Sequence, residues 1–323
     1  MKILIVGCGA VGQVYGLILQ KAGVELGLFD RPAVARTLEE ALGRGGLPLY
    51  QITFAHRRDP ILRRLEKFRV MADEDACRQF APDQIWFTVP SQAYHSEWFG
   101  DFVNKIPARR IVCFAPEGPR PEFFPEGGAE KMVFGGTAFM AWQGGPEAGG
   151  GTAGGVNFWL PGLGIPLAGT AEACREVGAI LMKAGLRFAA GKPDSKAQGG
   201  LTAAMTAFTA GLELAGWSLA EYRASPWLAR AGSAAGEAIR GQSPRAGAAA
   251  QALLGGPVLA AAFRIVALCL PALLPFDVEK YLRFHYTKTR EQTLALLEMY
   301  AADAEKRGMG AEGIRALEKA LRG

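Results

Sequence analysis

A glycine-rich turn close to the N-terminus constrains this chain more than any other feature. Residues 7–12 read GCGAVG, which is the pattern GxGxxG. The continuous apolar run at 2–6 before it predicts a buried parallel strand, and 13–22 after it carries apolar residues at helical spacing. A second strand is predicted at 25–29. Strand, glycine turn, helix and strand in this order predict a Rossmann βαβ unit.

Each glycine of this turn has its own role in such a unit. Gly7 permits the tight turn, Gly9 lets the backbone approach a pyrophosphate, and Gly12 lets the helix pack closely on the strand. The amino end of the helix, at Ala10 and Val11, then offers unpaired N–H groups and a partial positive charge to phosphate oxygens. We therefore predict that a nicotinamide dinucleotide binds across this loop.

The choice between NAD and NADP depends on two adjacent residues. Asp30 comes 17 residues after Gly12, at the end of the second strand, which is the spacing for a carboxylate that binds the adenosine ribose of NAD. The next residue, Arg31, suits the 2′-phosphate of NADP. We expect NADP, with NAD as the alternative, and a solvated loop residue as the other interpretation of Arg31.

Two more buried strands are predicted at 85–89 and 111–115, each followed by a turn-rich segment. Loops at the carboxyl ends of parallel strands line the ligand crevice of a doubly wound sheet. We therefore expect the dinucleotide also to contact Val89, Pro90, Ala115 and Pro116.

The length of 323 residues predicts two domains. The predicted secondary structure also changes along the chain, from strands and helices in the first part to helices alone in the second. Strands are also predicted at 131–134 and 156–160, and the glycine-rich stretch 144–155 is interpreted as a hairpin or long turn. From residue 193 onward, helical patterns dominate. The predicted fold is α/β: a Rossmann doubly wound sheet at 1–191 that binds the dinucleotide, followed by an all-α domain at 192–323 for substrate binding and dimerisation.

Composition excludes several classes of protein. Apolar residues make up 50% and charged residues 21%, as in ordinary globular proteins. The net charge of +5 is spread along the chain, so nucleic-acid binding is not expected. The five cysteines form no CxxC pair and there is no metal-ligand cluster, which favours a reducing cytoplasm and no bound metal. The apolar run before the glycines is too short for a signal peptide.

One segment, 257–276, is long and apolar enough to cross a membrane. Pro271, Pro275 and the central Arg264 argue against a spanning helix. We therefore expect a buried helix of the all-α domain, and no membrane association.

Two stretches of the chain resemble the ketopantoate reductase (2-dehydropantoate 2-reductase) family. They are KILIVGCGAVGQVYGLILQKAG, which starts at Lys2, and DSKAQGGLTAAMTAFTAGLELAG, which starts at Asp194. The resemblance implies reduction of a 2-oxo acid with NADPH. It also implies that Lys196 lies beside the substrate carbonyl, where a cation polarises the carbonyl and donates a proton as hydride arrives. A solvated lysine near a helix start is the other interpretation.

The chain departs from this family at several site positions. The family has asparagines one and two turns beyond the lysine, where this chain has Gly200 and Ala204. The family's asparagine near the nicotinamide is replaced by the run 115–117, and a lysine in the preceding loop by Pro90. For the family's late glutamate, Asp277 or Glu279 is the nearest match. These differences argue against ketopantoate as the substrate.

A polar stripe in the second domain provides another candidate. Tyr281, His285, Lys288 and Gln292 fall at i, i+4, i+7 and i+11, so a continuous helix would place them on one face. His285 is then an alternative proton donor. A simply solvated face is the competing interpretation.

The sequence therefore predicts an NAD(P)H-dependent oxidoreductase that transfers hydride to the carbonyl of a small 2-oxo acid in a cleft between the domains. Two alternatives remain open: a cofactor-binding sensor that has lost catalysis, and an enzyme similar to opine or imine reductases. Small residues in the second domain are compatible with a homodimer and equally with close intrachain packing. These are Gly199, Gly200, Ala203, Ala207 and Gly211.

Overall fold

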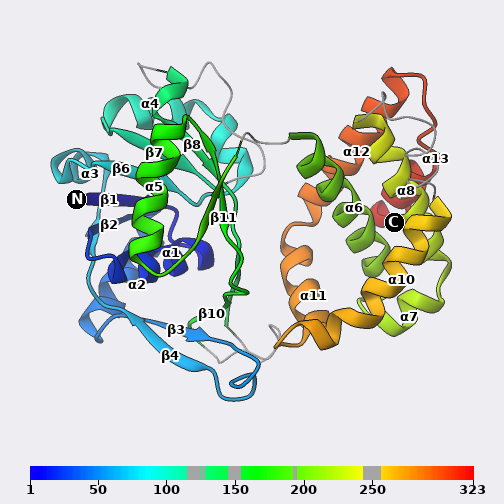
Figure 1. The fold of residues 1–323 in the computed structure, drawn as a ribbon, viewed down its shortest axis with the longest axis horizontal. Helices are drawn as coiled ribbons and strands as arrows, with labels where there is room; N and C mark the ends of the chain where they lie inside the picture. The colour runs from blue at the N-terminus through cyan, green and yellow to red at the C-terminus, as the bar shows by residue number, and fades with distance from the viewer. Residues whose placement is uncertain (115–123, 125–127, 145–153, 192–194, 243–255) are drawn as a thin grey trace. The chain divides into compact units, whose positions relative to one another are not determined.

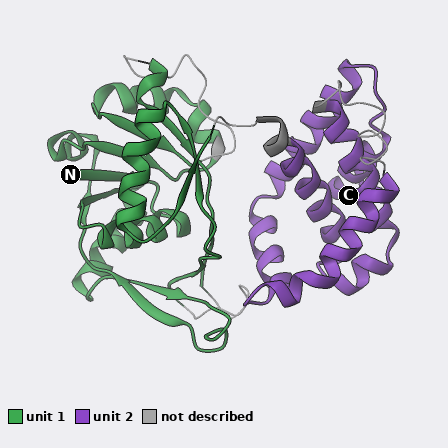
Figure 2. Cartoon of the chain, in the orientation of Figure 1, with its two compact units in different colours: residues 1–145, 151–193 green, residues 146–150, 194–323 purple. Residues whose placement is uncertain are grey.

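A computed structural model shows two compact units, which are coloured separately in Figure 2. It describes residues 1–114, 124, 128–144, 154–191, 195–242 and 256–323, without the side chains of residues 91, 195–199 and 242. Unit 1 holds the described residues up to Gly191, and unit 2 those from Ser195 onward. Each unit has its own core, so they are described separately.

Unit 1 is built on an eight-stranded sheet in the order β12-β11-β8-β7-β6-β1-β2-β5 (Figure 1). From β5 to β8 all neighbouring strands are parallel, β11 is antiparallel to β8, and β12 is parallel to β11. The strands are β1 (Lys2–Val6), β2 (Glu25–Phe29), β5 (Arg69–Met71), β6 (Gln84–Phe87), β7 (Arg110–Cys113), β8 (Met132–Gly135), β11 (Ile165–Gly169) and β12 (Phe188–Ala190).

Helices cover both faces of this sheet. Residues of α1 and α5 share one apolar core with the sheet, and residues of α3 and α4 share another. This confirms the predicted doubly wound α/β domain. The helices of unit 1 are α1 (Ala10–Lys21), α2 (Pro32–Gly43), α3 (Glu74–Phe80), α4 (Glu97–Lys105) and α5 (Ala171–Lys183), with the short 3-10 helices η1 (Ser91–His95) and η3 (Gly128–Lys131).

A second, four-stranded sheet packs against α1, and of its strands the sequence predicted only β10. Its order is β4-β3-β10-β9. The parallel pair β3 and β10 joins segments about a hundred residues apart. Of the two strands predicted beside the glycine-rich stretch, 156–160 corresponds to β10, which pairs with β9 antiparallel, whereas 131–134 corresponds to β8 of the main sheet. The strands are β3 (Leu47–Gln51), β4 (Ile61–Leu65), β9 (Met140–Gln143) and β10 (Val156–Trp159).

The described part of unit 2 is helical, as predicted, and α6 and α8 form its centre. Their contact is close because small residues meet there: Ala203, Ala207 and Ala231 are all buried. The helices are α6 (Ser195–Leu214), α7 (Leu219–Ala224), α8 (Pro226–Gln242), α10 (Gly256–Leu273), α11 (Val278–Lys288), α12 (Arg290–Lys306) and α13 (Glu312–Arg322).

The expectation of a buried helix at 257–276 was wrong, because only 11% of the apolar window of α10 is buried. Pro271 lies inside this helix, so it does not interrupt it. The helix is peripheral in unit 2 and packs against α8 and α7 along one side. By length and by its mean hydropathy of 1.9 it is the one helix among the described residues that passes the test for a membrane span.

Candidate functional site

The glycine loop lies where the strand order of the main sheet reverses. From β1 the chain proceeds to β2 and β5 in one direction, and β6, β7 and β8 follow on the other side of β1. Gly7 follows β1 and donates its N–H to the carbonyl of Phe29 at 2.9 Å, and Thr88 follows β6 and donates its N–H to the carbonyl of Val6 at 2.9 Å. In open α/β sheets this switch point is where ligands bind.

Packing requires two of the three glycines. Gly7 has a φ of +93°, and a Cβ there would lie 2.8 Å from Cγ1 of Val89. A Cβ on Gly12 would lie 2.1 Å from the carbonyl oxygen of Gly7 and 2.7 Å from Oγ1 of Thr88. The loop and the first turn of α1 are therefore held close to the end of β6.

Gly9 is different, because nothing in its own surroundings requires a glycine. Its φ is −67°, which any residue adopts, and a Cβ there would meet no atom within 4 Å. Gly9 is exposed and stands at the N-cap position of α1, and among the described residues no side chain caps this helix end. The first turn, which includes Ala10 and Val11, carries no acidic residue. Open space beside free N–H groups fits a pyrophosphate.

Asp30 is turned toward this loop. Its Oδ2 accepts the backbone N–H of Cys8 at 2.6 Å, and its Oδ1 accepts the backbone N–H of Arg31 at 2.7 Å. The Asp30 side chain is 14% exposed, whereas that of Arg31 is 87% exposed, with its Nε 3.8 Å from the carboxylate. The two adjacent residues therefore have different surroundings: Asp30 is fixed by backbone amides, and Arg31 is free to reach a ligand.

Thr88 is a residue of this loop region that sequence reasoning missed. Its hydroxyl donates to the carbonyl oxygen of Gly7 and so links the end of β6 to the glycine turn. Its position near the carboxyl end of the strand predicted at 85–89 was the available signal. The next two residues, Val89 and Pro90, were predicted to contact the dinucleotide. Val89 packs on Gly7, and Pro90 is exposed.

Cys8 lies within the loop but is not a reactive thiol. It is buried, and burial together with the nearby carboxylate of Asp30 raises its pKa well above the ordinary value. Its Sγ–H points to the carbonyl of Phe29 at 3.6 Å. The cysteine therefore fills space in the core of unit 1.

Several predicted site residues fall outside what the structure describes. Ala115 and Pro116 lie outside the described residues, and Lys196 is in the first turn of α6 with a side chain that is not described. Gly200 and Ala204, one and two turns further along α6, are half-buried. No polar side chain occupies these two positions.

The acidic candidates of unit 2 act as helix caps. Asp277 is the N-cap residue of α11, and its Oδ1 accepts the N–H of Lys280 at 3.1 Å. Oε1 of Glu279 accepts the N–H of Leu219 at 2.7 Å, at the start of α7. Both carboxylates are thus engaged with backbone groups at helix ends.

The predicted polar stripe is divided between two helices. The chain leaves helical geometry at Thr289, which ends α11 and begins α12, so Gln292 does not continue the face that carries Tyr281, His285 and Lys288. The expectation of one continuous helix was therefore wrong. Nor is the stripe simply solvated, because Tyr281 is buried.

His285 lies among aromatic rings. It stacks on Tyr281 with ring centroids 5.7 Å apart and meets Tyr286 edge to face at 5.0 Å. Although part of the ring remains exposed, desolvation by these neighbours and repulsion by Lys288 lower the pKa of His285 below its ordinary value of 6.5. The imidazole is therefore neutral at pH 7.

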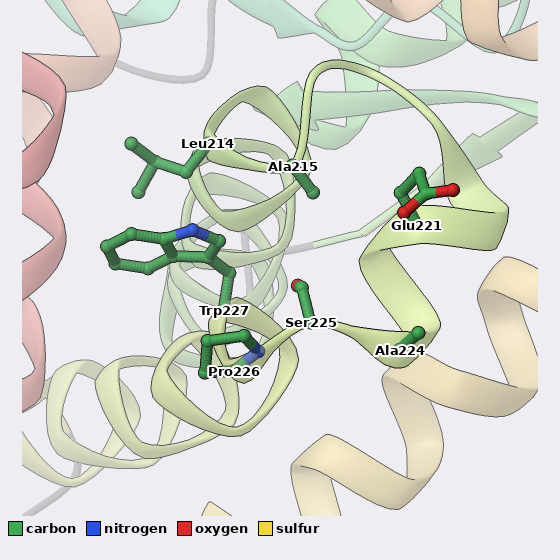
Figure 3. Close-up of a pocket in the computed structure, with 7 residues that line it drawn as sticks. All are labelled: Leu214, Ala215, Glu221, Ala224, Ser225, Pro226 and Trp227. Atoms are coloured by element: carbon green, nitrogen blue, oxygen red, sulfur yellow. The ribbon is translucent and has the colours of Figure 1, made fainter.

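Two cavities of the described residues lie away from the glycine loop. One, of about 560 Å³, is at the amino ends of the strands of unit 1, between Val24, Gln84, Arg109 and Lys183, which is the opposite edge of the sheet. Figure 3 shows the other, of about 290 Å³ in unit 2, with Trp227 and Glu221 on opposite sides and Ser225 between them. Neither contains a predicted site residue, and the described residues hold no cluster that could ligate a metal.

Comparison with known proteins supports the resemblance seen in the sequence. Residues 3–51, which contain the glycine loop and Asp30, match the family model described as ketopantoate reductase PanE/ApbA. No curated protein sequence matches the chain significantly.

Solved structures share the fold over the full length. A PanE/ApbA family ketopantoate reductase from Ralstonia eutropha JMP134 is 17% identical, with a TM-score of 0.65 and coverage of 100% of this chain and 97% of that one. A 2-dehydropantoate 2-reductase from Geobacter metallireducens GS-15 is 16% identical, with a TM-score of 0.63 and coverage of 100% and 99%.

A D-mandelate dehydrogenase, solved with NADH and anilino(oxo)acetate, is 14% identical, with a TM-score of 0.64 and coverage of 100% and 97%. At these identities the likeness extends to the fold, while the family model covers the loop itself. The chain therefore resembles the ketopantoate reductase family in its glycine-loop segment, and it shares the fold of solved structures named for that family.

Proposed function

We propose that this protein is an NAD(P)H-dependent oxidoreductase that reduces the carbonyl of a small 2-oxo acid. The observation that carries the proposal is the loop at the switch point of the sheet, where Gly9 leaves open space beside the free amino end of α1. A bound nicotinamide cofactor would supply the hydride. The chain's own residues would bind its pyrophosphate, orient its ribose and provide the proton.

Different residues of the loop region would bind the cofactor and hold the loop in position. The N–H groups of the first turn of α1, at Ala10 and Val11, would bind phosphate oxygens. Thr88 and Asp30 hold the loop in place through Gly7 and Cys8. Val89, Pro90, Ala115 and Pro116 would line the nicotinamide end of the site.

Arg31 supports NADPH over NADH. Its guanidinium is 87% exposed at the end of β2, while both carboxylate oxygens of Asp30 already accept backbone hydrogen bonds. A 2′-phosphate would add a charge-assisted contact there, whereas a free ribose diol would compete for occupied oxygens. We expect Arg31→Ala to weaken NADPH binding about tenfold or more and NADH binding little.

Lys196 is the proposed proton donor. A cationic side chain beside the substrate carbonyl stabilises the negative charge that develops on the oxygen and then protonates it. We expect Lys196→Ala to lower kcat/KM by about 10² or more, and Lys306→Ala, at an exposed end of α12, to leave it unchanged. His285 and Asp277 are secondary candidates for this role, because each has a feature that argues against it. His285 is neutral at pH 7, and the carboxylate of Asp277 is engaged as a helix cap.

The substrate class follows from the resemblance and from two solved neighbours. The Ralstonia structure is named a ketopantoate reductase, and the mandelate dehydrogenase was solved with an oxo acid analogue. Gly200 and Ala204 replace polar family positions, which favours a 2-oxo acid other than ketopantoate. The screen should include aliphatic and aromatic 2-oxo acids, each also with an added amine to detect an imine-reducing activity.

Titration of the protein with NADPH and NADH, followed by nicotinamide fluorescence, is the decisive first experiment. Gly9→Ala should fold normally and weaken nucleotide binding at least about tenfold, because its Cβ would enter the open space beside the loop. Gly43→Ala, which also meets no atom within 4 Å, is the matched control. Binding that Gly9→Ala leaves unchanged would place the nucleotide elsewhere.

Tight binding without turnover of any 2-oxo acid would favour the alternative function, a cofactor-binding sensor. The observation behind this alternative is the loss of polar side chains at Gly200 and Ala204. Oxidation of NADPH by a single member of the screen would exclude it.

A further inference from the structure

The proposed reaction does not use the cavity of about 560 Å³ in unit 1. This cavity lies at the amino ends of the strands, where α1 and α5 end, on the edge of the sheet opposite the glycine loop. All of its lining residues belong to unit 1, so the cavity is complete within that unit. Its volume is within the range of about 300–1,000 Å³ that is typical of small-molecule sites.

Gln84, the first residue of β6, brings a buried amide to this cavity. The residue is 3% exposed, and its Oε1 accepts the indole N–H of Trp86 at 2.9 Å. Because an indole N–H only donates, this bond fixes the orientation of the amide, with the oxygen toward Trp86 and Nε2 directed elsewhere.

The Nε2 of Gln84 has no acceptor among the described residues. It is not one of their fully enclosed unpaired atoms, so the opening that it faces is the cavity that Gln84 lines. A side-chain donor without an acceptor is uncommon at this degree of burial and needs an explanation. An acceptor oxygen on a ligand in the cavity provides one.

The two acidic residues that line the cavity are already engaged with donors of the protein. Glu176 accepts from the guanidinium of Arg109, and it accepts from that of Arg110 at 2.8 and 3.1 Å. Oδ2 of Asp83 accepts the backbone N–H of Lys2 at 2.7 Å. The negative charge beside the cavity is therefore largely compensated before any ligand binds.

Lys183 is the lining cation that remains. It lies in the last turn of α5, and it makes no ion pair within the part of the chain that the structure describes. Ala22 and Ile180, which are 1% and 6% exposed, form an apolar wall together with Val24. The cavity thus offers a buried neutral donor and a flexible cationic donor beside an apolar surface.

We propose that this cavity binds a small monocarboxylic acid with an apolar body. One carboxylate oxygen accepts from Nε2 of Gln84, and the ammonium of Lys183 compensates the charge. The hydrocarbon part packs on the wall of Ala22, Val24 and Ile180. An amine of the same skeleton would leave the amide without an acceptor and would meet the cation with a like charge.

NMR titration of the full chain, labelled with ¹⁵N and free of nucleotide, tests the proposal with isovalerate and phenylacetate. Neither acid has a 2-oxo group, so neither is a substrate of the proposed reaction. The side-chain amide signal of Gln84 is identified as the one missing from Gln84→Glu. It should shift and saturate with either acid, together with the indole signal of Trp86. Isopentylamine and phenethylamine, which have the same skeletons, should not shift it.

Saturation-transfer NMR observes the ligand and compares the variants. Gln84→Glu keeps an oxygen for Trp86 but replaces the free donor by negative charge, and it should weaken binding of both acids at least about tenfold. Gln143→Glu, at an exposed position of β9, is the matched control and should bind like the wild type. Lys183→Met should remove the preference for phenylacetate over its neutral amide.

Filling the cavity provides a second test that leaves Gln84 in place. Ala179 is exposed on α5 and lines the cavity, so Ala179→Trp should fold normally and abolish binding of both acids. Met182→Trp, at a position of the same helix that is 60% exposed and does not line the cavity, is its control.

Three results would overturn the proposal. They are an amide signal of Gln84 that neither acid shifts, acid binding that survives both Gln84→Glu and Ala179→Trp, and a preference for the amines. Because every measurement is made without nucleotide or turnover, each of these results would leave the proposed oxidoreductase function unaffected.

Discussion

The carboxylate of Asp30, at the end of β2, accepts a hydrogen bond from the backbone N–H of Cys8 in the glycine loop at 2.6 Å. The same carboxylate accepts the N–H of Arg31 at 2.7 Å. An acidic residue at this position is usually considered for its contact with a ribose. Here it also holds the loop that would bind the pyrophosphate.

This arrangement predicts a stability effect in the ligand-free protein. Asp30→Ala leaves the N–H of Cys8 without its acceptor in a partly buried position, which costs about 1–3 kcal/mol in the free energy of unfolding. Urea unfolding without nucleotide measures the effect. Asp101→Ala, at an exposed position of α4, is the control and should change little. Equal stability of Asp30→Ala and the wild type would show that the carboxylate serves only the ligand.

Gly12 and Gly9 should respond oppositely to the same substitution. In Gly12→Ala the added methyl would lie 2.1 Å from the carbonyl oxygen of Gly7, so loop and helix must separate, at a cost of about 3 kcal/mol. Gly9→Ala should melt within a few degrees of the wild type, since nothing lies within 4 Å of its Cβ. Calorimetry of the two variants side by side checks this. A destabilised Gly9→Ala would contradict the open loop.

Arg110 and Glu176 form the most buried ion pair of unit 1 among those described. Arg110 is 8% exposed, and its guanidinium donates to both oxygens of Glu176, at 2.8 and 3.1 Å. Glu176→Ala leaves the buried guanidinium with the more distant Glu172, and we expect a loss of about 2–4 kcal/mol in the free energy of unfolding. Glu172→Ala, at a carboxylate that is 67% exposed, should cost less than about 1 kcal/mol. Similar losses in the free energy of unfolding for Glu176→Ala and Glu172→Ala would contradict the prediction that the buried pair matters more than the exposed one.

His285 predicts how the stability depends on pH. Its folded pKa is below the ordinary value of 6.5, so below about pH 6.5 the unfolded chain binds a proton that the folded chain does not. Its contribution to stability is therefore complete above pH 6.5 and is lost as the pH falls through the lowered pKa. Urea unfolding of the wild type and His285→Gln at pH 7.5 and 5.5 measures it: the variant should lose less stability on acidification.

The exposed His56 provides the control for this comparison, since His56→Gln should follow the wild type at both pH values. A titration of His285 by NMR with a midpoint above 6.5 would contradict the assignment. Such a midpoint would mean that a carboxylate, and not the aromatic neighbours, governs the ring.

Local patterns were sufficient to predict the opening strand, turn, helix and strand of unit 1. The strand at 25–29 and the glycine turn before it were predicted from residues adjacent in sequence, because an apolar run, a turn and a helical period are local properties. The same holds for the helical character of the second half. The role of Asp30 as a possible ribose ligand also followed from spacing alone.

Tertiary structure decided what local patterns do not contain. The four-stranded sheet depends on the pairing of β3 with β10, which are distant in sequence. This pairing is made by backbone groups, so it leaves no periodic pattern of side chains in the sequence. The break at Thr289 separated Gln292 from His285, although the spacing alone indicated one face. The apolar run of α10 predicted a buried helix, but which of its faces is covered depends on the helices packed beside it. Hydropathy identifies apolar residues, whereas their burial depends on contacts made across the fold.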